Sequence, residues 1–78
     1  MIEIRNFIVD KKSGIIICEG RKVKVVDKYN SEVEGKIKNI NKDHFYIERE
    51  TEEGTQLSAF YEWQVDSIKL TDLPRVAL

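Results

Sequence analysis

Apolar and polar residues alternate with a period of two along most of this chain. The pattern is clearest at residues 23–25, 33–37 and 45–47, where polar residues separate the apolar ones. A strand with one buried face has this period, because successive side chains point to opposite faces of a sheet. The pattern predicts an all-β chain.

Turn-forming residues separate the alternating runs. Gly, Asn or Asp occurs in each break, at residues 11–14, 28–31, 41–43 and 52–54, where a positive φ or a side-chain cap helps the chain to reverse. The sequence therefore predicts seven strands, near Ile2–Val9, Gly14–Glu19, Lys22–Lys28, Val33–Asn41, His44–Thr51, Thr55–Tyr61 and Val65–Leu70.

The segment Gln56–Ile68 is ambiguous, because its apolar residues also have the spacing of one helix face. The turn at residues 52–54 favours strands, since it would close a hairpin with Thr51 opposite Thr55. This register places Phe45 opposite Tyr61, and one face of the hairpin is then apolar.

The same register predicts which side chains are buried. The expected core consists of Val23, Val25, Ile37, Phe45, Ile47, Leu57, Ala59, Tyr61 and Ile68. Trp63 has the same phase as Tyr61, so we expect it to cap one end of the core. Tyr46 and Phe60 would pair on the opposite, polar face, and two adjacent exposed aromatic side chains are typical of a protein interface. Three covers are open for this pair: the N-terminal segment with Phe7 or Ile8, a second copy or a protein partner, and a stacked base.

The segment from Val23 to Ile47 resembles the first half of an Sm-like small barrel, a member of the SH3-like barrels. The resemblance rests on alternating apolar residues, a turn, a glycine in the second strand and a final apolar–polar pair, here Val23, Val25, Asn30, Val33, Gly35, Ile37, Ile40 and Asn41. It implies a small five-stranded SH3-like (Sm-like) barrel. We expect an N-terminal β-hairpin extension in place of the helix of that family.

Two departures from the family concern its RNA-binding positions. Phe45 stands where RNA-binding members have an Asn, and residues 63–68 contain no counterpart of their Arg-Gly pair. Gly35 retains a physical role, because a long strand must bend to close a small barrel and glycine permits the bend. The resemblance therefore implies a fold without the family's usual RNA site.

The chain has 78 residues, which is the size of one domain. We expect a hairpin extension at residues 1–20, the barrel at residues 21–72 and a tail at residues 73–78, since Pro74 ends regular structure. The longest apolar run, Ile15–Cys18, is far short of the roughly 20 residues that cross a bilayer. We expect a cytoplasmic protein without a membrane partner.

Charge is segregated along the chain although its net value is −1. Residues 21–42 hold seven bases against three acids, and residues 43–66 hold seven acids against one base. If the fold separates these segments, the molecule has a basic and an acidic side that orient its partners. If neighbouring strands interleave them, they form ordinary solvated pairs.

Four lysines fall on alternate positions of two strands that are expected to pair, Lys22, Lys24, Lys36 and Lys38. Such a stripe binds phosphate backbones in nucleic-acid-binding proteins. Lysine is also the usual residue of a solvated strand face and of a protected sheet edge. Both interpretations remain open at this point.

No set of residues indicates catalysis, a metal site or a cofactor. One cysteine and one histidine are too few for a structural zinc site, the glycines lack phosphate-loop spacing, and nothing combines a nucleophile with a base. We therefore expect a non-enzymatic interaction module that docks on a protein or self-associates, with Tyr46 and Phe60 at the interface. The alternative is a nucleic-acid-binding barrel that uses the lysine stripe.

Overall fold

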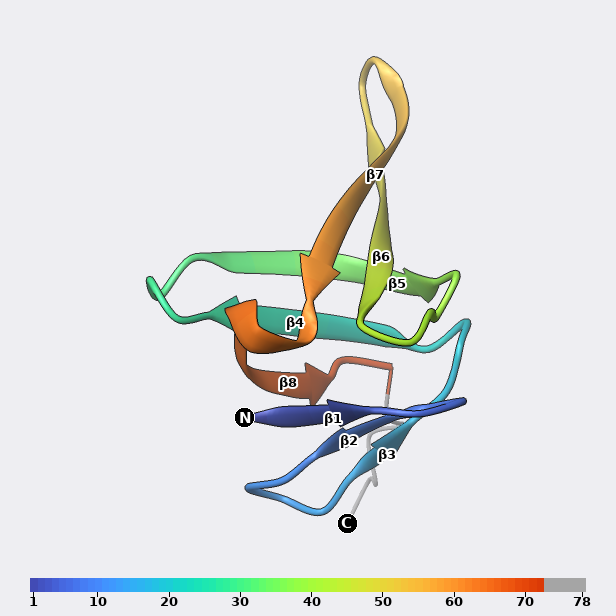
Figure 1. Cartoon of the computed structure of the whole chain (residues 1–78). Coiled ribbons are helices and arrows are strands. Elements are labelled where there is room, and N and C mark those ends of the chain that lie inside the picture. The colour runs from blue at the N-terminus through green and yellow to red at the C-terminus, as the bar shows by residue number, and fades with distance from the viewer. Residues whose placement is uncertain (73–78) are drawn as a thin grey trace, which may run out of the picture.

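The computed structural model describes residues 1–72, which form two antiparallel sheets (Figure 1). The first sheet has the order β1-β2-β3, with β1 Ile2–Ile4, β2 Ile8–Asp10 and β3 Ile16–Ile17. The second sheet has the order β7-β6-β5-β4-β8, with β4 Lys22–Asp27, β5 Glu32–Lys38, β6 His44–Thr51, β7 Gly54–Tyr61 and β8 Val65–Leu70. The 3₁₀ helix η1, Glu62–Gln64, joins β7 to β8. The predicted tail at residues 73–78 lies outside the described residues.

The predicted all-β architecture is confirmed. The limits of β6 and β8 coincide with the predicted strands, and strands rather than a helix flank η1 in the segment that was ambiguous. Asn30 has a φ of 64°, as expected for a turn residue that replaces glycine. Among residues 1–72, no helix has the length and apolar character that a membrane span requires.

The five-stranded sheet is not closed into a barrel, because β7 and β8 are its two outer strands. β5 pairs with β6 only from Lys36 to Lys38, so β6 departs from β5 at Gly35. Beyond this point β6 and β7 continue as a two-stranded hairpin that projects from the rest of the molecule, and we call this hairpin the arm (Figure 1).

The N-terminal segment is a three-stranded sheet, so the predicted two-stranded hairpin is wrong. The expected strand Ile2–Val9 is broken by a turn in which the Arg5 N–H donates to the Phe7 carbonyl at 2.7 Å. Ile4 then pairs with Ile8. Because the buried residues Ile2, Ile4 and Ile8 all keep the even phase across this turn, alternation alone could not reveal it.

One hydrophobic core connects the two sheets. It contains Ile2, Ile4, Ile8, Ile17, Val23, Val25, Ile37, Phe45, Ile47, Phe60, Val65 and Ile68. Six of the nine predicted core residues are among them. The prediction is wrong for Leu57, Ala59 and Tyr61, which are exposed, and for Trp63, which is 61% exposed on η1 and caps nothing.

A shift of one residue in the β6–β7 register explains these errors. The sequence predicted a three-residue loop with Thr51 opposite Thr55, whereas Thr51 pairs with Gly54 across a two-residue loop. Gly54 has a φ of 115°, which a residue with a side chain rarely adopts. Because side chains alternate with a period of two, this shift turns every residue of β7 to the opposite face.

Asp10 connects the N-terminal sheet to the outer side of β8. Its side chain is buried, with 3% of the residue exposed. One carboxylate oxygen accepts the backbone N–H of Lys12 at 2.9 Å and that of Ser13 at 3.4 Å, and the other accepts the buried N–H of Ile68 at 3.0 Å. The carboxylate thus satisfies a backbone donor that would otherwise be buried without a partner.

We expect Asp10→Ala to lower the free energy of unfolding by about 2 kcal/mol, because the buried N–H of Ile68 loses its acceptor. Chemical denaturation measures this loss. Asp66→Ala is the control, because Asp66 is an exposed acid on β8, the strand of Ile68, and its carboxylate makes only a long, exposed ion pair with Lys12 Nζ at 3.9 Å. Equal stability of the two variants would contradict the structural role of Asp10.

Candidate functional site

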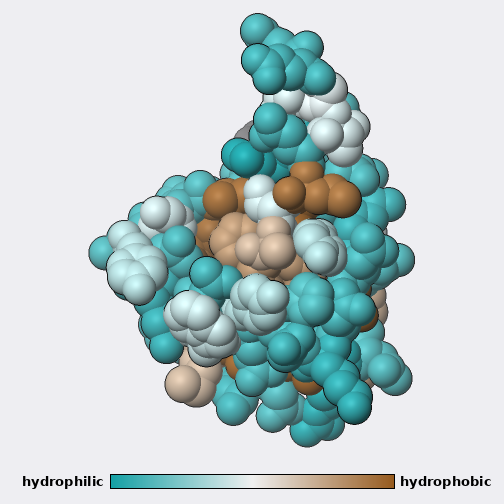
Figure 2. Space-filling model, turned by 45° about the horizontal axis from the view of Figure 1, so that its top comes forward, coloured by the Kyte–Doolittle hydropathy of each residue, from teal (hydrophilic) through white to brown (hydrophobic). Residues whose placement is uncertain are grey.

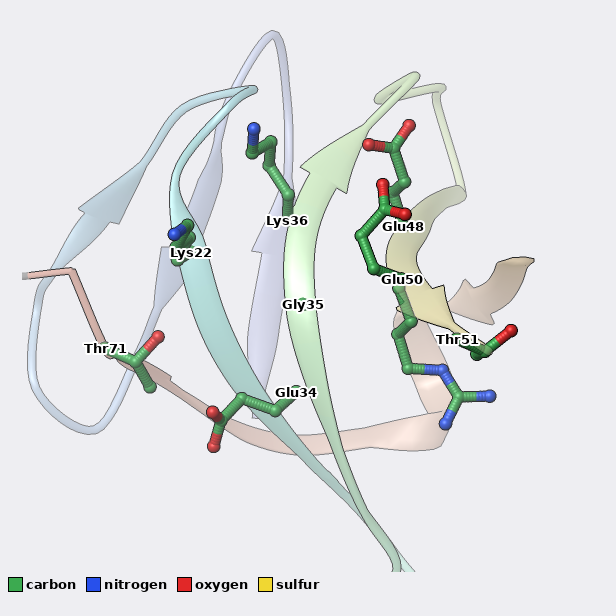
Figure 3. Close-up of a pocket in the computed structure, with 9 residues that line it drawn as sticks. Lys22, Glu34, Gly35, Lys36, Glu48, Glu50, Thr51 and Thr71 are labelled. Carbon is green, nitrogen blue, oxygen red and sulfur yellow. The ribbon is translucent and has the colours of Figure 1, made fainter. Parts of the chain in front are cut away.

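A groove of about 400 Å³ lies where the arm leaves the β4–β5 pair (Figure 3). Gly35 forms part of its wall with bare backbone, since it carries no side chain. We call this feature the charged groove, and it is lined by Lys22, Glu34, Gly35, Lys36, Glu48, Arg49, Glu50, Thr51 and Thr71.

The fold brings two of the four predicted lysines to the charged groove. Lys22 on β4 and Lys36 on β5 lie directly opposite each other in the sheet. Lys24 and Lys38 are outside the groove, and Lys24 Nζ lies 3.3 Å from the carboxylate of Glu32. Within residues 1–72, neither Lys22 nor Lys36 has a carboxylate oxygen within 4.0 Å.

Carboxylates line the facing wall of the charged groove. Glu48 and Glu50 project from β6 across from the two lysines, and Glu48 is the cross-strand partner of Lys36 (Figure 3). Arg49 adds a third cation, whose Nε is buried and has no hydrogen-bond partner among residues 1–72. The groove therefore mixes both signs of charge, as expected from interleaved strands rather than from a separate basic side.

The predicted surface pair of Tyr46 and Phe60 does not exist. Tyr46 lies opposite Ala59, and Phe60 lies opposite Phe45. Phe60 is 8% exposed and stacks on Phe45 with 5.9 Å between ring centroids. Phe60 is thus covered by the core of its own chain, and this leaves Tyr46 without the predicted aromatic neighbour.

Tyr46 instead belongs to a cluster of rings where β6 begins and β7 ends. The His44 ring lies 5.6 Å from the Tyr46 ring and 5.2 Å from the Tyr61 ring. The Nδ1 atom of His44 is 2.6 Å from a carboxylate oxygen of Asp43. Sequence reasoning missed Tyr61 as a surface residue, and the preference of hairpins for two-residue loops was the signal that could have found it.

β7 presents an open edge, because within residues 1–72 no strand pairs with its outer side. We call this side of Gly54–Tyr61 the β7 edge. Its eight residues include no charged residue and no proline, and its pairing with β6 contains no bulge. Proteins normally protect an exposed edge with lysine, proline or a bulge, so the β7 edge is unprotected.

Exposed apolar side chains lie beside this edge. Leu57 is 54% exposed and shares a face of β7 with Ala59 and Tyr61, and Trp63 follows on η1. Figure 2 shows an apolar patch at the foot of the arm, while the tip of the arm is hydrophilic. An open backbone edge next to exposed apolar side chains is a surface suited to another extended strand.

The opposite outer strand of the sheet is already covered. The N-terminal amine of Met1 donates to the Asp66 carbonyl of β8, and the Ile68 N–H of β8 donates to Asp10. The Ile4 N–H of β1 reaches the Glu62 carboxylate on η1 at 3.0 Å. Among residues 1–72, the N-terminal sheet therefore covers β8, and the β7 edge is the uncovered end of the five-stranded sheet.

Arg21 and Asp72 form an ion pair beside the start of β4. The guanidinium donates to both carboxylate oxygens at 2.8–3.2 Å, and the backbone N–H of Lys22 donates to the same carboxylate at 3.1 Å. These hydrogen bonds, first of all the one from Arg21, lower the pKa of Asp72 from 3.8 to about 2, and the same pairing raises the pKa of Arg21. The pair fastens the end of β8 to β4.

The lowered pKa of Asp72 predicts a pH dependence of stability. Because the folded pKa lies below the ordinary value, the contribution of this carboxylate is fully present above pH 3.8 and is lost as the pH falls through about 2. We expect the stability difference between the wild-type chain and Asp72→Asn to vanish across this range. Urea denaturation of both at several pH values measures it. A difference that stays constant down to pH 2 would contradict the assignment.

Comparisons with known proteins give no match. No protein-family model matches the sequence, and neither the curated proteins nor the solved structures contain a significant relative. The functional argument therefore rests on the residues and geometry of this chain.

Proposed function

We propose that this chain is a non-enzymatic protein-interaction module that docks through the β7 edge. In this proposal the five-stranded sheet is an open form of the small SH3-like (Sm-like) barrel, with its last strand, β8, beside its first, β4. The observation that carries the proposal is an eight-residue edge strand without charge, proline or bulge.

The β7 edge supports docking by addition of a strand. Its free N–H and C=O groups supply backbone hydrogen bonds to any extended partner, and this is the general source of affinity in strand addition. The exposed side chains of Leu57 and Tyr61 supply apolar contacts beside the backbone pairing. Because strand addition reads alternate side chains, Leu57 and Tyr61 are the residues expected to select a partner.

The experiment is a selection of displayed random peptides on the immobilised chain, followed by hydrogen exchange of the complex. We expect bound peptides to slow exchange at β7 amides and to lose at least tenfold in affinity for Leu57→Glu. Ile16→Glu is the matched control, because Ile16 is a strand residue of similar exposure, 57%, on the other sheet. Peptides that bind all three proteins equally would contradict docking through β7.

A second candidate function is nucleic-acid binding at the charged groove. It is favoured by Lys22 and Lys36, which lie opposite each other without a carboxylate within 4.0 Å among residues 1–72. Glu48 and Glu50 in the same groove oppose a phosphate backbone. A mobility-shift assay with single-stranded RNA at low and moderate salt tests it, and a salt-dependent shift that Lys22→Glu abolishes would favour this function.

A further inference from the structure

The β7 edge is one-sided, and this limits the assemblies that it can form. A chain with two free sheet edges can join copies head to tail into a ring or a filament. Here β8 is covered by the N-terminal sheet through Asp10 and Met1, so within residues 1–72 only β7 is free among the outer strands of this sheet. A contact that uses the same edge on both chains closes after two copies.

We propose that the occupant of the β7 edge is a second copy of this chain, paired β7 to β7 in antiparallel orientation around a two-fold axis at Ser58. This inference rests on the proposed function, since it names the partner of the same edge. The two five-stranded sheets become one continuous sheet of ten strands.

Charge favours this occupant. β7 carries no charged residue, so self-pairing places no like charges opposite each other. The tip of the arm is acidic, with Glu52 and Glu53 in the loop. Antiparallel pairing sends the two acidic tips to opposite ends of the joined sheet, whereas parallel pairing would bring them together.

The conformation of β7 selects the register. Gly54 has a φ of 115° and is therefore not extended, so the residues available for pairing are 55–61, with Ser58 at their centre. Pairing around Ser58 places Leu57 opposite the partner's Ala59 and Thr55 opposite the partner's Tyr61. Each exposed apolar side chain on one face of β7 then meets another residue of the same face.

Light scattering tests the dimer and its register together. We expect a mass of twice 9.1 kDa for the wild-type chain. The double variant Leu57→Glu with Ala59→Glu sets like charges opposite each other at two places, so its mass should fall by half. The matched control is Leu57→Glu with Ala59→Lys, which sets opposite charges at the same two places and should remain dimeric.

Far-ultraviolet circular dichroism of both variants shows whether the monomer is still folded. A folded monomeric Glu/Glu variant beside a dimeric Glu/Lys variant supports the proposed register. If both variants keep the mass of a dimer, or if both are monomers, the pairing of Leu57 with the partner's Ala59 is wrong.

Cross-linking provides an independent test that introduces no charge. In a Cys18→Ser background, which removes the one native cysteine, Ser58→Cys should form a disulfide-linked dimer upon mild oxidation. Thr55→Cys is the control, because this position faces the partner's Tyr61 and should not cross-link to itself. Equal cross-linking of the two variants would overturn the two-fold axis at Ser58.

The two proposals can fail separately. A monomeric wild-type chain that binds selected peptides along β7 overturns self-pairing and leaves docking through the β7 edge intact. A monomeric chain that binds no peptide, or binds peptides without slowing exchange at β7, overturns both.

Discussion

Phe60→Ala is expected to lower the free energy of unfolding by about 3–5 kcal/mol, whereas Leu57→Ala should change it by no more than about 0.5 kcal/mol. Phe60 is 8% exposed and stacks on Phe45 in the core, and Leu57 is 54% exposed on the opposite face of β7. Truncation of the buried ring leaves a cavity, while truncation of the exposed side chain removes few contacts.

Urea denaturation measures the free energy of unfolding of both variants. It is carried out at a protein concentration where light scattering gives the mass of a monomer. This condition matters because Leu57 lies in the proposed dimer contact. The comparison tests the register of the arm directly, since a shift of one residue exchanges the two faces of β7. A large loss for Leu57→Ala with a small one for Phe60→Ala would show that Thr51 pairs with Thr55 instead of Gly54.

The second large effect is expected at Gly35, where valine should cost about 2–4 kcal/mol. A Cβ atom at this position would collide with the Glu48 carbonyl oxygen and lie 2.6 Å from Ile47 Cγ2. Both neighbours belong to β6, and the carbonyl is part of its backbone. The clash can be relieved only if β6 moves away from β5, at the point where the arm departs.

Gly35→Ala is a smaller change than Gly35→Val at the same site, and Gly14→Ala is its matched control. Gly14 has a φ of 75° and open space around its Cα, so alanine there reports backbone strain alone, about 1 kcal/mol. Gly35→Ala has no such strain and reports the steric contact alone. Thermal unfolding of the three variants should rank the losses as Gly35→Val, then Gly35→Ala, then Gly14→Ala. A neutral Gly35→Val would mean that β5 and β6 are not in close contact.

The function predicted from sequence and the surface found in the structure overlap only in part. Lys22 and Lys36 do lie together, because they pair across β4 and β5 as alternation indicated. The glutamates that face them come from β6, and their position depends on how the arm departs at Gly35. The predicted interface residue Phe60 is buried, and its place on the surface is taken by Leu57 and Tyr61.

Local features of the sequence determined the fold class, the turn at Asn30 and the limits of β6 and β8. Period-two alternation and turn residues such as Asn30 act over a few positions, so they need no knowledge of distant contacts. The core residues of β4, β5 and β6 were predictable for the same reason, since most apolar side chains of these strands, such as Val23, Ile37 and Ile47, occupy odd-numbered positions.

Only the tertiary structure decided which face of β7 is buried. β7 has apolar residues in both phases, Leu57 in one and Phe60 in the other, so alternation cannot choose between them. The choice depends on the two-residue loop before Gly54 and on the space beside Phe45 that a second ring fills. The open β7 edge likewise could not be predicted from sequence patterns, because it depends on which strands pair: within residues 1–72, β7 pairs only with β6, and the N-terminal sheet covers β8 instead.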